Sequence, residues 1–117
     1  MLFGYGWEHL HAAVESIACS EEPLQQRLAD AFLNDINFVQ ERHVSAAVWK
    51  RLVVMRTEFG KVRPTGNESA IIATTAKMSD EEAAKWLKEI LFLYEEVCRD
   101  YARQEYANRF SSGFSRT

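Results

Sequence analysis

The sequence predicts an all-α protein, a small bundle of four to five helices with a long C-terminal helix. Apolar residues recur at intervals of three and four along most of the chain, which is the period of one helix face. Only two Pro and five Gly interrupt this pattern. The one segment that also suits a strand, around Ile71 and Ile72, has no second strand elsewhere in the chain to pair with. These observations favour helices throughout.

Length and composition are those of one soluble domain. The 117 residues fall within the usual size range of single domains, roughly 100–150 residues. Hydrophobic residues make up 47% and charged residues 26%, and the formal net charge is −3. This balance excludes a disordered tail, a fibrous repeat and a strongly basic nucleic-acid-binding protein. We expect one helical domain over residues 1–110 and a flexible, Ser/Gly-rich C-terminal tail over 111–117.

The first third of the chain contains two amphipathic segments. The apolar residues of the first are Trp7, Leu10, Val14 and Ile17. Ser20 and Pro23 mark a break and a new helix start, because Pro is tolerated only in the first turn of a helix. The apolar residues of the second segment are Leu24, Leu28, Phe32, Ile36 and Val39. Asn34 and Asp35 weaken its last turn, because their side chains compete for the backbone hydrogen bonds of a helix.

Two further helices are expected on either side of a loop. Ser45 is suited to cap a third helix, and Gly60 is suited to end it. The apolar face between them consists of Val48, Leu52, Met55 and Phe59. Residues 60–67 form the clear loop, and Asn67 is expected to cap a short helix that extends to Lys77.

The last helix is the most strongly indicated. Ser79 and Glu82 form a capping box, and acidic residues in the first turn suit the positive end of the helix dipole. A helix over 79–110 would be about 48 Å long. A compact domain of this size has a radius of gyration of about 13 Å, so a helix of this length must kink, fray or project beyond the domain. Its expected buried side chains are Trp86, Leu87, Ile90, Leu91, Tyr94 and Val97.

Aromatic residues outside this buried stripe indicate a protein contact. Phe92 lies among charged residues on the opposite side of the helix, and Tyr106, Phe110 and Phe114 follow at four-residue spacing. An apolar patch with a polar rim often marks a protein interface. We therefore expect a non-enzymatic protein–protein interaction module, an adaptor or regulator, that binds another protein or forms a homo-oligomer through its long C-terminal helix.

The distribution of charge leaves an alternative open. Between residues 42 and 63 there are six basic residues and one acidic residue, a net charge of +5, and the remainder of the chain has a net charge of −8. The basic residues are Arg42, Lys50, Arg51, Arg56, Lys61 and Arg63. Such a stretch could bind nucleic acid or another anionic ligand. The interpretation we favour is a solvated face whose charges pair with the acidic last helix.

Motifs for catalysis, cofactors and membranes are absent from the sequence. It contains no Gly-rich phosphate loop, nucleophile elbow or dinucleotide fingerprint. His9 and His11 are two residues apart and would point to different sides of a helix, so no metal site is expected. No apolar run approaches the ~20 residues of a membrane span, and no secretory signal is recognisable. We expect a cytoplasmic protein, without cofactor, whose Cys19 and Cys98 are reduced.

Overall fold

A computed structural model describes the backbone of residues 2–115 and the side chains of residues 2–110. Every regular element within these residues is a helix, which confirms the all-α prediction. The elements are α1 (Phe3–Cys19), α2 (Leu24–Asn34), α3 (Ala46–Phe59), α4 (Ala70–Ala76) and α5 (Asp80–Ser115). Two one-turn 3₁₀ helices, η1 (Ile36–Phe38) and η2 (Glu41–His43), connect α2 to α3.

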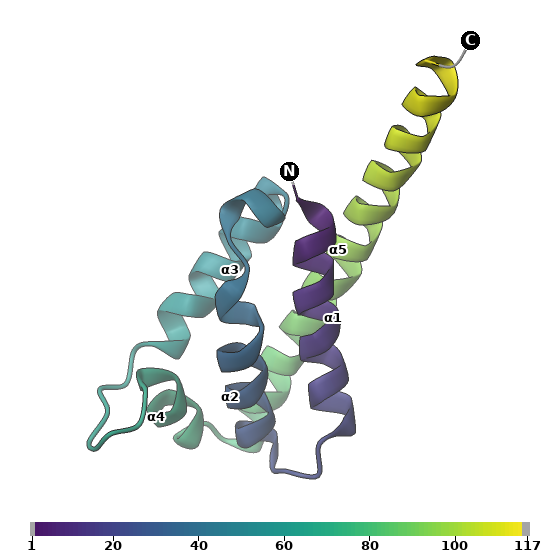
Figure 1. Ribbon diagram of the computed structural model, residues 1–117. Helices are drawn as coiled ribbons and strands as arrows, with labels where there is room; N and C mark the ends of the chain where they lie inside the picture. Colours follow the sequence, from purple (N-terminus) through teal and green to yellow (C-terminus); the bar gives the residue numbers. More distant parts are fainter. Residues whose placement is uncertain (1, 116–117) are drawn as a thin grey trace.

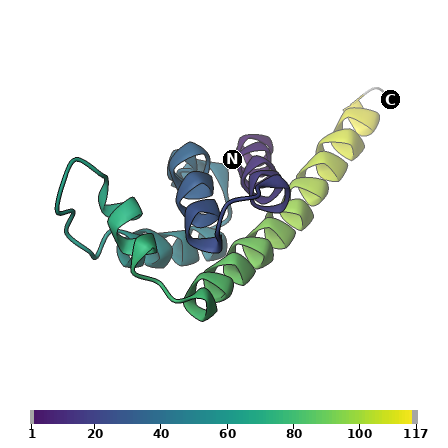
Figure 2. The ribbon, with the colours of Figure 1, turned by 90° about the horizontal axis from the view of Figure 1, so that it is seen from below.

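The first four helices form a body against which α5 lies. α1 packs against both α2 and α5, while α4 packs against α2 (Figure 1). Seen from below, α5 runs diagonally along one side of this body and continues well past it at the C-terminal end (Figure 2). The core contains apolar residues from α1, α2, α3 and α5, among them Leu10, Phe32, Leu52, Phe59, Ile90, Leu93 and Val97.

An aromatic cluster joins three helices at the centre of the core. The rings of Phe32 in α2 and Phe59 in α3 stack with their centroids 4.7 Å apart. Trp86 in α5 meets Phe59 edge-on at 5.4 Å. Such ring pairs contribute beyond the area they bury, so this cluster fixes α2, α3 and the N-terminal part of α5 to one another.

The third helix forms as its sequence predicts. Ser45 caps it, because the Ser45 hydroxyl accepts a hydrogen bond from the Val48 backbone N–H at 3.3 Å. All four predicted apolar residues of its face are buried. Gly60 follows its last residue with a φ of −100°, so the helix ends there without a left-handed turn.

The second helix ends earlier than the apolar pattern predicts. Ile36 and Val39 are fully buried, but α2 stops at Asn34 and the chain turns at Asp35 into η1. The Arg56 guanidinium donates hydrogen bonds to the carbonyl oxygens of Ile36, Asn37 and Val39. These long-range bonds satisfy carbonyl groups that a continued helix would have satisfied internally.

The fourth helix is present, but its predicted cap is wrong. Ser69 caps α4 in place of Asn67, and its hydroxyl accepts a hydrogen bond from the Ile72 N–H at 3.3 Å. The side chains of Thr74 and Thr75 are buried. The Thr74 hydroxyl accepts the Val62 N–H at 3.1 Å and so connects the preceding loop to α4. The choice of helix over strand is confirmed.

The buried face of α5 is displaced to one side of the predicted stripe. Ser79 caps the helix, and its hydroxyl accepts the Glu82 N–H at 3.1 Å. Ile90 and Val97 are buried, and three of the other predicted residues are half-buried. The prediction for Leu91 is wrong, because that side chain is 47% exposed, and Leu93 is fully buried in its place. α5 contacts α1, α2 and α3 together, so its covered face is wider on the Leu93 side than the stripe indicates.

The length of α5 is accommodated by projection. It is one helix of 36 residues, about 54 Å long, and the molecule measures 63 × 25 × 22 Å. The backbone of residues 111–115, in the predicted tail, continues α5, while residues 116–117 lie outside the described part of the chain. No helix of the described residues has an apolar stretch long enough to cross a membrane.

Replacing Gly6 tests the close approach of α1 to η2. A Cβ atom at Gly6 would collide with the carbonyl oxygen of His43, whereas one at Gly60 would make ordinary contacts of 3.4 Å or more. Gly-to-Ala in a helix interior normally stabilises by roughly 0.5–1 kcal/mol. We expect Gly6→Ala to reduce the free energy of unfolding by about 1–3 kcal/mol instead. Urea unfolding followed by circular dichroism measures this, with Gly60→Ala as the control. A Gly6→Ala protein as stable as the wild type would contradict this packing.

Candidate interaction surface on α5

The C-terminal part of α5 extends beyond the body. Tyr101 still contacts the body, because its ring lies 5.9 Å from that of Trp7 in α1. After it, every side chain from 102 to 110 is exposed except that of Gln104, which is half-buried. We call residues 102–115 the arm; it is about 21 Å long. Tyr106 is 70% and Phe110 56% exposed, and their rings stack at 6.2 Å.

These aromatic residues lie on the side of α5 that faces away from the core. Val97 is buried, and at about 100° per residue Tyr106 is rotated by about 180° from it around the helix axis. The same side carries an unbroken series of exposed residues, which we call the outer face. It consists of Lys88, Leu91, Phe92, Glu95, Arg99, Ala102, Arg103, Tyr106, Arg109 and Phe110.

The predicted partner-binding residues do not form one patch. Phe92, Tyr106 and Phe110 share the outer face, but Phe92 lies about 27 Å along the helix from Phe110. The fourth residue, Phe114, lies outside the described side chains. Among the described side chains of this set, Tyr106 and Phe110 are in direct ring contact.

Phe92 also has a role within the fold. It is 39% exposed, and the Arg51 guanidinium from α3 lies over its ring at 4.1 Å. Arg51 also pairs with Glu89 in α5 through two hydrogen bonds of 2.9 and 2.5 Å, which raises the pKa of Arg51. Phe92 therefore helps to attach α3 to α5, and its exposed edge remains part of the outer face.

Leu91 is the outer-face residue that the sequence pattern assigns to the core. Its side chain borders an apolar groove of about 330 Å³ between the C-terminal end of α1 and the N-terminal third of α5. Val14, Ile17 and Leu87 also line this groove. The helical pattern indicates that Leu91 is apolar and near the stripe, but only the positions of the neighbouring helices show that it is uncovered.

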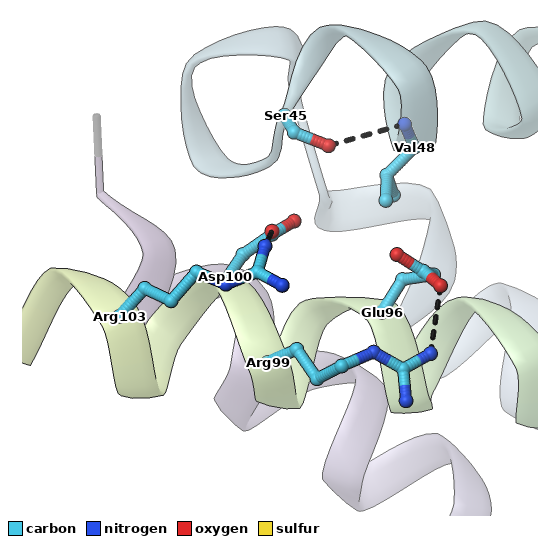
Figure 3. A network of polar contacts seen from close by, with 6 residues as sticks. All are labelled: Ser45, Val48, Glu96, Arg99, Asp100 and Arg103. Carbon is cyan, nitrogen blue, oxygen red and sulfur yellow. Dashed lines mark hydrogen bonds and ion pairs between the residues drawn. The ribbon is translucent and has the colours of Figure 1, made fainter.

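Arg99 and Arg103 of α5 form ion pairs with acidic residues of the same helix. Arg99 Nη2 lies 2.7 Å from Glu96 Oε1, and Arg103 Nη1 lies 3.6 Å from Asp100 Oδ1. Glu95, four residues before Arg99, is exposed on the outer face. Figure 3 shows both ion pairs, with the Glu96 carboxylate between α5 and the first turn of α3. A carboxylate there suits the positive end of the α3 dipole.

The basic stretch is spread over the fold and partly used by it. Arg42 precedes α3, while Lys61 and Arg63 follow this helix, which is about 21 Å long. Arg51 is paired with Glu89, as the favoured interpretation anticipates, and Lys61 pairs with Glu58 at 2.9 Å. Burial lowers the pKa of Arg56, whose guanidinium is bonded to backbone carbonyls. Lys50 is exposed on α3.

A second polar cluster lies where α1 meets the α2–α3 connection. His9 Nδ1 lies 3.1 Å from Asp35 Oδ1, and the Tyr5 ring lies between His9 and His43. His43 is buried, and its Nδ1 accepts the Gln40 N–H at 2.9 Å. Burial lowers the pKa of His43, and the nearby Arg42 charge lowers it further. The neutral ring that accepts this hydrogen bond is thus a structural element of the connection.

In the described part of the chain, no three His, Cys, Asp or Glu side chains are grouped so that they could hold a metal ion. Cys19 and Cys98 are both free thiols. Comparison with known proteins identifies no relative, since no family model, curated protein or solved structure matches the chain.

Substitution of Arg56 tests whether the basic stretch is structural. We expect Arg56→Ala to lower the free energy of unfolding by about 2–3 kcal/mol, because three backbone carbonyls lose a charged donor. The matched control, Lys50→Ala on the exposed side of α3, should change it by less than about 0.5 kcal/mol. Urea unfolding of both proteins decides the matter. Equal effects of the two substitutions would contradict the structural role of Arg56.

Proposed function

We propose that this protein is a non-enzymatic helical interaction module that binds another polypeptide chain through the arm of α5. The observation that carries the proposal is the stacked pair of exposed rings, Tyr106 and Phe110, on a helical extension beyond the body. Tyr is among the residues that most often dominate the energy of protein interfaces. The function is that of an adaptor or regulator.

The energetics of the arm support this role. Most of the stability of a helix in a protein comes from the packing of its apolar face, and the described side chains of the arm, residues 102–110, have little such packing. A partner that packs on its apolar side would stabilise the helix and cover the rings together. Burial of the two rings would remove on the order of 200 Å² of apolar surface from water, about 5 kcal/mol before the cost of association.

The cytoplasm is the compartment that suits the proposal. Cys19 and Cys98 are free thiols, and Cys19 is exposed at the end of α1. Cytoplasmic thiols remain reduced, whereas an exposed thiol in an oxidising compartment would be prone to form disulfides.

Site-specific photo-crosslinking in the native cell tests the proposal. Tyr106 of the full chain is replaced by the photoreactive aromatic p-benzoylphenylalanine, and the control carries it at Val54, a 57% exposed apolar position on α3. We expect irradiation to yield a discrete protein adduct from position 106 and none from position 54. Absence of an adduct at position 106, or equal adducts at both positions, would contradict the proposal.

A further inference from the structure

The charges of the outer face follow an order along α5. Beyond Lys88 at the N-terminal end, the acid Glu95 comes first, and the arginines Arg99, Arg103 and Arg109 follow toward the C-terminus. All five are exposed. Glu95 and Arg109 are separated by about 21 Å along the helix and by only about 40° around it. They therefore cannot pair within one helix, but they lie on the side that a second helix would contact.

Two copies of this face attract each other in only one relative direction. In a parallel arrangement Glu95 would face Glu95, and Arg109 would face Arg109, which places like charges together. In an antiparallel arrangement centred on Ala102, Glu95 of each copy faces Arg109 of the other. A two-fold axis generates this contact twice, as in other isologous dimers.

The rest of the outer face fits the same register. Ala102 at the crossing point is small, so that two helix axes can approach to roughly 8–10 Å. Arg99 of each copy comes within one residue of the level of Tyr106 in the other, where a guanidinium can lie over the ring. Phe110 comes within one turn of Phe92 in the second copy, and an aromatic contact there would cover the exposed edges of both rings.

We propose that the outer face of α5 binds a second copy of this chain, antiparallel and centred on Ala102. The inference rests on the proposed role of the arm, whose partner it names. Because the outer face is opposite the buried face of α5, the two bodies would lie on opposite sides of the helix pair. The two helices would overlap from residue 89 to residue 115 of each copy, over about 40 Å. This is a small interface, so we expect a dimer that dissociates at micromolar concentrations.

Two charge reversals and their mixture test the pairing. Glu95→Arg and Arg109→Glu each place like charges opposite one another at both symmetric contacts. We expect either variant alone to raise the dimer dissociation constant about tenfold or more, measured by light scattering in low salt. An equimolar mixture should recover dimers that contain one copy of each variant, which native mass spectrometry identifies by mass. Lys50→Glu, a reversal on the exposed side of α3, should leave the dimer unchanged.

Each alternative outcome is decisive. If the wild type dimerises but the mixture of variants forms no mixed dimers, the antiparallel register is overturned. If either reversal alone dimerises as tightly as the wild type, the same conclusion holds. If the wild type remains a monomer up to millimolar concentration, self-association is overturned. In that case an adduct of position 106 with a different protein would still support the proposed function.

Discussion

The structure depends on a mismatch in length between α5 and the helices available to cover it. α5 has 36 residues, about 54 Å, whereas α1, the longest of the other helices, has 17 residues, about 26 Å. A bundle built on α5 can therefore bury only part of it. The elongated shape, the exposed rings of the arm and the extended outer face all follow from this difference.

Aromatic contacts lie at the two ends of the segment of α5 that packs against the body. Trp86 joins the N-terminal part of α5 to Phe59, and Tyr101 meets Trp7 at the point where α1 begins. Between these contacts α5 is held on its inner side, while its outer side carries charges and a few apolar side chains. The body thus leaves one long face of α5 uncovered.

Local signals in the sequence were sufficient for the caps of α3 and α5, although not for that of α4. Ser45 and Ser79 are examples, because a capping hydroxyl bonds to a backbone N–H only three residues away. Asn34 and Asp35 indicate a weak last turn of α2, but the turn into η1 could not be predicted, since the carbonyls released there are satisfied by Arg56, some 20 residues along the chain. Leu91 was predicted to be buried in place of Leu93 for a similar reason. Both are apolar neighbours of the stripe, and the position of α3 decides which of them is covered. The extent of the outer face could not be predicted either, because it depends on which side of α5 the other helices cover.

The most direct test of the central claim, that the outer face of α5 is the surface for association, is a dilution series followed by amide chemical shifts in NMR spectra. Between tens of micromolar and millimolar protein, we expect concentration-dependent shifts for residues of the outer face, from Lys88 to Phe110, and constant shifts for α2 and α4. Shifts that map to α2 and α4, or spectra that do not change with concentration, would contradict self-association through this face.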